Sequence, residues 1–301
     1  MSNQTLDQEI TQYIIDNIND NNVPWRKPYE ATHVTVITPM RHNHEFYRGI
    51  NTILLMSAAF CRQYTSPYWL TYRQAQSISA KVRKSEKGFR VIKFGTFEPE
   101  DSKTLPSSGS MNPEKSSQRP YIKRYTVFNI EQIENLPEDY QQVRTVEKIT
   151  THEVHRFADA LSIPVRHGNS HGQYIRSGND EEHIRLPNYE SYPDDDAYIA
   201  TFFHELIHAT GHQKRLARLV NNPDDAQQSF EELVAELGSV MLCIRFGIST
   251  DTDNRHIPYI KGWLQGLKND HRMILKAASE AQKAIDYLMD MPGYPNLFSD
   301  K

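Results

Sequence analysis

The sequence predicts a protein of the α+β class that is built from two domains. The chain has 301 residues, roughly twice the length of an average domain. Stretches with apolar residues at helical spacing alternate with short stretches rich in aromatic and β-branched residues, which are typical of strands. A segment at 136–144, which contains Pro137, separates two parts of different charge. We therefore predict domains at residues 1–136 and 145–301.

The first domain is expected to combine three helices with a β-hairpin. Helices are predicted over residues 6–22, 52–64 and 71–79, where apolar residues share one helical face. Strands are predicted over residues 89–97 and 121–128. Residues 98–120 between them contain six Ser, four Pro and no aromatic residue, a composition that cannot bury enough apolar surface to order itself. We therefore expect a flexible insertion in the hairpin.

The second domain is expected to be mainly helical with a small sheet. It opens with a predicted helix over residues 146–161, followed by short strands near 163–166, 173–175 and 183–187. Long helices are then predicted over residues 197–216, 227–246 and 257–289, the last of them interrupted near Asn269.

The composition excludes several classes of protein. Two cysteines, Cys61 and Cys243, are too few for a disulfide scaffold or a cysteine-based zinc finger. No apolar run reaches the roughly 20 residues that cross a bilayer. Residues 1–10 carry Asp7 and Glu9 but no basic residue, unlike a secretory signal. We therefore expect a cytoplasmic protein with no membrane partner.

The charge is distributed unevenly along the chain. Residues 1–97 hold 12 Lys and Arg against 7 Asp and Glu, a net charge of +5, whereas residues 137–301 hold 17 against 25, a net charge of −8. A basic first half is compatible with a polyanionic partner such as nucleic acid. A net charge of this size over about a hundred residues is also within ordinary variation.

The strongest chemical signal is the sequence His204-Glu205-Leu206-Ile207-His208. Two histidines four residues apart project from the same face of a helix, so their imidazoles can bind one zinc ion. Glu205 lies near the same side and can serve as the general base that takes a proton from a water activated by the zinc. The alternative is an amphipathic helix in which the histidines are incidental.

A catalytic zinc site needs a third protein ligand, and the sequence offers three candidates. His212 follows His208 by four residues, but Gly211 interrupts first, which favours a supporting or surface role. Glu232 lies on the next predicted helix with Glu236 four residues later, as in gluzincin-type enzymes, so that Glu232 would bind zinc and Glu236 would hold a ligand imidazole in its tautomer. Glu231 is the third candidate. We favour Glu232.

Further residues could support the chemistry of such a site. Tyr174, Tyr189 and Tyr198 are candidate donors to a developing oxyanion, although Tyr198 is more compatible with packing. Residues 173–176 could form an edge strand that pairs with an extended peptide.

The basic half mixes cationic and aromatic residues in a pattern that suits single-stranded nucleic acid, because aromatic rings stack on unpaired bases and Lys and Arg neutralise phosphates. The alternative is that the tryptophans belong to the core and the lysine-rich stretch is a solvated turn. The candidate DNA-binding residues are Trp25, Arg26, Lys27, Arg48, Asn51, Trp69, Arg83, Lys84 and Lys87.

Several motifs in the same order resemble those of plasmid antirestriction proteins of the ArdC type. In the first half these are residues 24–28 (PWRKP), 47–51 (YRGIN), 66–71 (SPYWLT), 82–88 (VRKSEKG) and 125–129 (YTVFN), and in the second half 184–187 (IRLP), 198–201 (YIAT), 204–212 and 231–238. The resemblance implies an N-terminal domain that binds single-stranded DNA, also found in some plasmid primases, and a zincin-like metallopeptidase domain.

The resemblance further implies a protein that protects incoming mobile DNA from restriction. Two hypotheses remain open. In the first, a zinc peptidase is brought to a DNA-associated protein substrate by single-stranded DNA. In the second, the protein shields the DNA and its zinc domain is structural rather than proteolytic. A nuclease is disfavoured, because the basic half has no Asp/Glu cluster of the kind that binds two metal ions.

Overall fold

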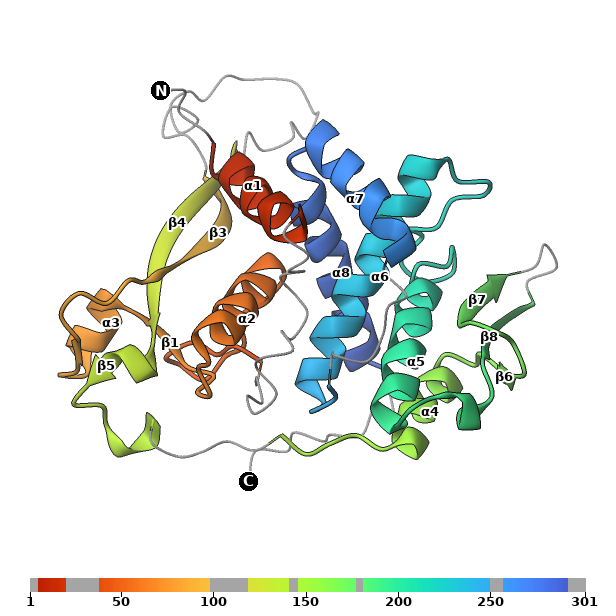
Figure 1. Cartoon of the computed structure of the whole chain (residues 1–301), viewed down its shortest axis with the longest axis horizontal. Helices are drawn as coiled ribbons and strands as arrows, with labels where there is room; N and C mark the ends of the chain where they lie inside the picture. The colour runs from red at the N-terminus through yellow and green to blue at the C-terminus, as the bar shows by residue number, and fades with distance from the viewer. Residues whose placement is uncertain are drawn as a thin grey trace, which may run out of the picture.

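The computed structural model describes residues 5–19, 38–97, 119–140, 146–176, 181–249 and 257–291. A lobe that contains the strands β1 to β5 lies at one side of the molecule, and a helical lobe with the sheet of β6, β7 and β8 lies at the other. Helices α1, α2 and α8 lie between these two sides (Figure 1). Among the described residues, no helix is both long and apolar enough to span a membrane.

The first lobe combines three helices with two small sheets. The helices are α1 (Leu6–Asn19), α2 (Ile50–Arg62) and α3 (Tyr72–Ser77). One antiparallel sheet has the order β1 (Trp69–Thr71), β4 (Arg119–Asn129), β3 (Phe89–Phe97), and the other pairs β2 (Lys81–Val82) with β5 (Ile133–Glu134). Short 3-10 helices follow at Ile130–Gln132 and Glu138–Tyr140.

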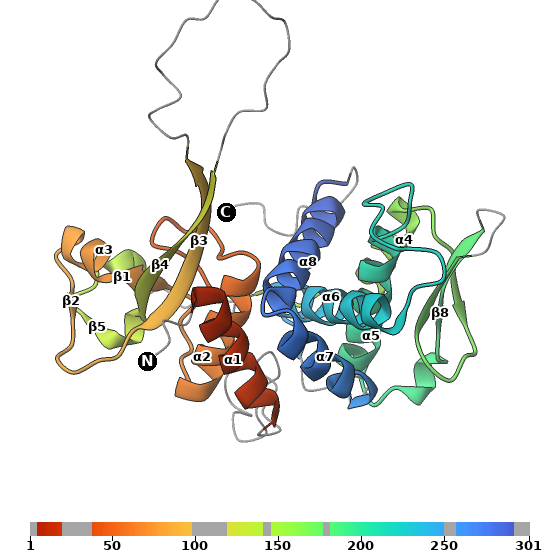
Figure 2. The same cartoon turned by 90° about the horizontal axis from the view of Figure 1, so that it is seen from above.

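The predicted hairpin is present, since β3 and β4 pair from Phe89 opposite Val127 to Phe97 opposite Arg119. Because β4 begins at Arg119, the last two residues of the predicted insertion at 98–120 belong to the strand. The rest of that insertion, 98–118, lies outside the described residues. Figure 2 shows the β3–β4 hairpin projecting from the body of the molecule, with α1 and α2 beside its base.

The second lobe places a three-stranded sheet beside a group of helices. The sheet has the order β6 (Val165–His167), β8 (Glu182–Leu186), β7 (Gln173–Arg176), with β6 parallel and β7 antiparallel to β8. The helices are α4 (Thr151–Ala160), α5 (Asp195–Thr210), α6 (Asp225–Arg245), α7 (Ile257–Asn269) and α8 (Met273–Met289), and a 3-10 turn lies at Tyr189–Ser191. The predicted order of helices and strands in this lobe is therefore confirmed, whereas the short strands β1, β2 and β5 of the first lobe were not predicted.

One apolar core runs through both lobes. It includes Ile14 of α1 and Ile53 of α2 together with Phe203 of α5 and Leu237 of α6, all of them fully buried. Burial of apolar surface is the main favourable term in folding, so the helices of the first lobe are stabilised by those of the second. The boundary at 136–144 in the chain therefore does not mark a break in the core.

Candidate metal centre

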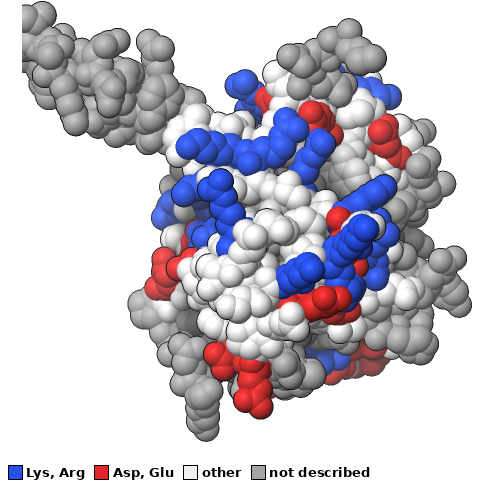
Figure 3. All heavy atoms as spheres, turned by 90° about the vertical axis from the view of Figure 1, so that its left-hand side faces the viewer, with Lys and Arg blue, Asp and Glu red and all other residues white. Residues whose placement is uncertain are grey.

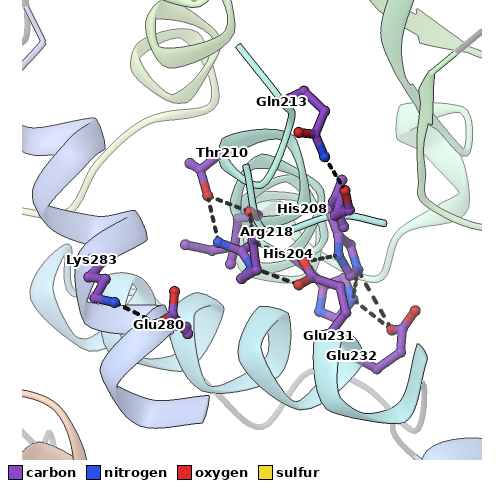
Figure 4. Close-up of polar contacts among 11 residues, drawn as sticks. His204, His208, Thr210, Gln213, Arg218, Glu231, Glu232, Glu280 and Lys283 are labelled. Carbon is purple, nitrogen blue, oxygen red and sulfur yellow. Dashed lines mark hydrogen bonds and ion pairs between the residues drawn. The ribbon is translucent and has the colours of Figure 1, made fainter. Parts of the chain in front are cut away.

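Helix α5 presents the histidine pair toward one point. The Asp194 carboxylate accepts a hydrogen bond from the backbone N–H of Ala197 at 2.8 Å and so begins the helix nine residues before the first histidine. His204 and His208 lie one turn apart with their ring centroids 4.8 Å apart and their Nε2 atoms 3.2 Å apart. Figure 4 shows the two imidazoles side by side.

Helix α6 supplies a carboxylate to the same point. Glu232 Oε2 lies 3.4 Å from His204 Nε2 and 3.7 Å from His208 Nε2. Together with the 3.2 Å between the two nitrogens, these distances put the point equidistant from all three atoms about 2.0 Å from each, which is the length of a zinc–nitrogen or zinc–oxygen bond. His204, His208 and Glu232 thus form a donor set of the size that a divalent metal ion needs.

The close approach of α5 and α6 depends on a glycine. A Cβ atom at Gly238 would lie 2.8 Å from Cδ1 of Ile207, so a larger residue there would force the Ile207 side chain to move. The Asp224 side chain caps α6, since it accepts a hydrogen bond from the N–H of Gln227 at 2.7 Å. The first contact sets how closely α6 packs on α5, and the second sets the residue at which α6 begins. Together they position Glu232.

The largely buried carboxylate of Glu231 contacts the side of the His208 ring that faces away from the shared point. Glu231 Oε1 lies 3.0 Å from His208 Nδ1 and accepts from Arg218 Nη2 at 2.8 Å, while Oε2 accepts from Arg218 Nε at 2.6 Å (Figure 4). With its proton on Nδ1, the imidazole presents the Nε2 lone pair to the shared point. The sequence prediction assigned this role to Glu236. That role stays a prediction for Glu236, which lies in the wall of the adjacent cavity, whereas at His208 the contact is made by Glu231.

The centre attracts cations. Burial disfavours the charged imidazolium, but hydrogen bonds to Glu231 and Glu232 outweigh that effect and raise the pKa of His208 to about 10. Burial likewise opposes ionisation of Glu232, yet its contacts with both histidines keep its pKa well below the usual range. In the protein without a metal, a proton on the imidazole therefore offsets part of the charge of the two carboxylates, and Arg218 beside Glu231 offsets the rest. A divalent cation can take the place of the proton.

The loop that follows α5 positions Arg218, which holds the Glu231 carboxylate against His208. The helix ends at Thr210 rather than at the predicted residue 216, and Arg218 and Leu219 donate backbone hydrogen bonds back to the carbonyl of Gly211. This fold turns the Arg218 side chain onto the carbonyl of Ile207 at 2.7 Å and onto Glu231. His212 is buried, and its Nδ1 accepts from the N–H of Lys214 at 3.1 Å, so it is not part of the metal donor set.

Glu205 is held by the edge strand β7. The side chain is 4% exposed, and its Oε2 accepts a hydrogen bond from the N–H of Tyr174 at 2.6 Å. A Cβ atom at Gly172 would lie 2.8 Å from Glu205 Oε1 and 2.7 Å from Cγ2 of Thr201. A side chain at residue 172 would therefore force Thr201 or the Glu205 carboxylate to move. Sequence reasoning missed both this contact and Arg218, since neither has a local signal.

The three candidate tyrosines do not present free hydroxyls to the metal centre. Tyr198 is buried, with its hydroxyl between Nε2 of His155 at 2.7 Å and Nε2 of His167 at 3.1 Å, which confirms the packing role. The Tyr174 hydroxyl donates to Glu182. Tyr189 is exposed and donates to Asp195.

A cavity of about 930 Å³ opens beside the metal centre. Its wall runs from Glu205 and the histidines to apolar side chains on α6 and α7, including Val240 and Trp263, and to Arg176 at the end of β7. Because β7 lies at the edge of its sheet, the cavity is bordered by a strand with backbone groups that face away from β8.

The predicted DNA-binding residues have varied positions. Trp25, Arg26 and Lys27 lie outside the described residues. Trp69 is 1% exposed and packs edge-on against Phe89 with ring centroids 5.3 Å apart, so its predicted role in stacking on bases is wrong and the core alternative is correct.

The other predicted DNA contacts are partly engaged within the protein. Asn51 binds the backbone N–H and carbonyl of Ile92 at 2.9 and 2.7 Å and so joins α2 to β3. Arg48 pairs with Asp286 of α8. Arg83 pairs with Glu86 at 2.8 Å, whereas Lys84 and Lys87 are exposed on the turn before β3.

Comparison with known proteins identifies both lobes. Residues 4–128 match the N-terminal domain of anti-restriction factor ArdC, and residues 152–280 match a zincin-like metallopeptidase. The metal-free crystal structure of the antirestriction protein ArdC from plasmid R388 is 38% identical with a TM-score of 0.77, over 95% of this chain and 97% of that one. The chain belongs to the ArdC family of antirestriction proteins. A Mn(II)-bound structure of the same plasmid protein is 37% identical with a TM-score of 0.76, over 99% of this chain and all of that one.

Other relatives of this ArdC-family chain come from bacteria. An uncharacterised protein of Sinorhizobium fredii, y4eC, is 32% identical over 93% of this chain and 90% of its own length. A DNA primase TraC of Escherichia coli is 32% identical over 94% of this chain, which corresponds to 27% of the primase. The ArdC-like unit therefore also occurs within a larger DNA-processing protein.

Proposed function

We propose that this protein is a cytoplasmic zinc-dependent peptidase that binds single-stranded DNA and protects incoming mobile DNA from host restriction. The observation that carries the proposal is the donor set of His204, His208 and Glu232 around one point, with Glu205 held next to it. Membership of the antirestriction family supports the biological role.

The residues fit a zinc ion. Two imidazoles and one carboxylate are the protein ligands of many catalytic zinc sites, and the spacing of their donor atoms suits zinc bond lengths. Bound zinc would supply a Lewis acid that polarises a peptide carbonyl and activates water.

Residues of the protein itself would transfer the proton, orient the ligand imidazole and bind the substrate. Glu205 accepts a proton from the attacking water and passes it to the leaving amine, while the N–H of Tyr174 fixes the carboxylate in the wall of the cavity that the histidines also line. Glu231 and Arg218 keep His208 in the tautomer that leaves Nε2 unprotonated. An extended substrate can lie along the outer edge of β7, beside the Tyr174 N–H that Glu205 already occupies, and place its side chains in the cavity.

A metal measurement tests the ligand assignment. Protein purified without added metal is expected to contain close to one zinc per chain, and His208→Ala should lose most of it. Glu205→Ala should keep its zinc, because Glu205 is not a ligand. Zinc-free parent protein that also fails to bind added Zn²⁺ would rule out the assignment.

Glu205→Ala also separates the peptidase from the shielding alternative. Parent and variant are compared for cleavage of DNA-associated proteins, with and without single-stranded DNA, and for protection of transferred DNA. If hydrolysis is the mechanism, the variant loses both cleavage and protection while it keeps zinc and DNA binding. A variant that protects as well as the parent would show that shielding is the mechanism.

The DNA partner is tested by its salt dependence. We expect single strands to bind more tightly than duplex, with an affinity that falls steeply as salt rises, because each neutralised phosphate releases counterions. Equal affinity for duplex, or an affinity independent of salt, would contradict this proposal.

A further inference from the structure

The exposed part of the β3–β4 hairpin carries a distinctive arrangement of side chains. We call residues 93–95 and 121–125 the outer ribbon. Toward its base the same hairpin is covered, because Val91 and Val127 pack in a cluster with residues of α2, and Ile92 belongs to the main core. Beyond that point the strands continue while the side chains become exposed.

Two lysines face each other across the outer ribbon. Lys93 and Lys123 are directly paired in the antiparallel register, and both are exposed. Like charges directly opposite each other destabilise a sheet. Within the described residues neither lysine pairs with a carboxylate. By contrast, Arg90 and Arg124 of the same hairpin both pair with Glu9 of α1.

Aromatic rings flank this lysine pair on the same face. Tyr125, two residues from Lys123, is 40% exposed. Tyr121, two residues away in the other direction, lies across Gly95, where a Cβ atom would be only 2.4 Å from the ring, and Lys123 Nζ lies 5.0 Å from the ring centroid. Since residues two apart in a strand share a face and are roughly 7 Å apart, the face alternates aromatic, cationic and aromatic groups.

We propose that this face of the outer ribbon binds single-stranded DNA, with Lys93 and Lys123 on phosphates and Tyr125 stacked on a base. The inference rests on the proposed function and adds the surface that performs the binding. An anionic strand between the lysines would relieve their mutual repulsion. Figure 3 shows extended bands of Lys and Arg side chains across the upper and middle part of this side of the molecule.

The arrangement favours a single strand over a duplex. Base faces in a duplex are stacked on one another, so an exposed tyrosine has no ring to contact there, whereas in a single strand every base offers a π face. The lysine-rich turn before β3, with exposed Lys84 and Lys87, can extend the contact with the backbone toward the base of the hairpin.

The test measures binding of a fluorescent oligo-dT strand and of a duplex of equal length by anisotropy at several salt concentrations. The Lys93→Gln/Lys123→Gln double variant should bind the single strand roughly 20-fold more weakly at 0.1 M salt and lower the slope of log K against log salt by about 1.4. Tyr125→Ala should lose at least about fivefold, whereas Tyr125→Phe keeps the ring and should bind like the parent.

Two controls make the test specific. Phe94→Ala removes an aromatic ring that is 56% exposed on the opposite face of the ribbon, and Lys283→Gln removes an exposed lysine on α8, so both should bind like the parent. The double lysine variant should melt at the same temperature as the parent or higher, because a like-charge pair has been removed. Weaker binding can then not be attributed to unfolding.

The outcomes separate this inference from the proposed function. A parent that binds no single-stranded DNA refutes the proposed function itself. A parent that binds while the double lysine variant keeps the same affinity and salt slope overturns the ribbon surface alone. An equal loss of duplex and single-strand binding in Tyr125→Ala would overturn the stacking role.

Discussion

Replacing Glu231 by Gln tests how the metal centre is built. The carboxylate makes contacts with His208 Nδ1 at 3.0 Å and with Arg218 Nε and Nη2 at 2.6 and 2.8 Å. A glutamine has the same shape but only one acceptor oxygen. Because Arg218 donates to both carboxylate oxygens, the guanidinium faces an NH₂ group in either orientation of the amide, and in one orientation the imidazole faces it as well. Because the site is buried, that donor is left without a partner.

The expected cost is a metal affinity about 10- to 100-fold lower, the usual effect of losing a carboxylate that orients a ligand imidazole. This corresponds to roughly 1.4–2.8 kcal/mol of binding free energy. The assay is a competition for Zn²⁺ between metal-free protein and a fluorescent chelator at fixed pH and salt, with His208→Ala as the reference for a lost ligand.

Glu236→Gln is the matched comparison, because Glu236 lies on the same helix and lines the same cavity. It should lower the affinity less than Glu231→Gln does, because the orienting contact at His208 Nδ1 is made by Glu231. If Glu236→Gln loses tenfold or more while Glu231→Gln binds like the parent, the original sequence assignment is right and our reading of the contacts at His208 fails.

Three further substitutions have expected outcomes. Gly172→Ala places a methyl group within 2.8 Å of Glu205 Oε1. Zinc binding should persist while peptidase turnover falls roughly 100-fold, as expected for a general base displaced by about 1 Å. Unchanged turnover would contradict the view that the chain at Gly172 positions Glu205. Trp69→Ala should lower the free energy of unfolding in urea by about 3–5 kcal/mol; a stable variant that has lost only DNA binding would restore the stacking role. Burial opposes ionisation of Asp7, but hydrogen bonds, including one from Arg272, lower its pKa to about 2. Asp7→Asn should therefore cost at most about 2 kcal/mol above pH 4, and the difference should vanish as the pH falls toward 2; a difference that does not change between pH 6 and pH 3 would contradict it.

The sequence predicted most elements to within a few residues, because apolar periodicity is a local property. The larger errors fell at helix ends. The predicted helix at 146–161 begins only at Thr151, since the Thr150 side chain accepts from the N–H of Glu153 and Glu153 bonds back to Thr150. That Thr-x-x-Glu pattern is a capping box and was visible in the sequence.

The metal centre shows where sequence reasoning stops. The two histidines and Glu205 lie within one helical turn, so their spacing alone places them together. The choice among Glu231, Glu232 and Glu236 depends on how α6 is rotated against α5. That rotation is set by packing between distant segments, such as Gly238 against Ile207, and has no local pattern.

The DNA-binding residues were harder to predict from the sequence than the metal ligands, for a different reason. Tryptophan and asparagine have the same chemistry in a core as at an interface, so Trp69 and Asn51 could be assigned only once their neighbours were known. The outer ribbon went unnoticed because its lysines are far apart in the sequence, and only the strand register brings Lys93 opposite Lys123.

The positions of the two sites limit how DNA could influence the peptidase. The β3–β4 hairpin and the metal centre between α5 and α6 lie toward opposite sides of the molecule, with the common core between them (Figure 1). A strand bound at the hairpin therefore does not itself occupy the cavity, and a close-packed core transmits little movement without a second stable packing. The main effect expected of DNA is to raise the local concentration of substrates bound to the same strand. Single-stranded DNA should then accelerate cleavage of DNA-bound proteins but leave cleavage of a short free peptide unchanged. Equal acceleration of both substrates would instead show that DNA acts on the catalytic centre through the core.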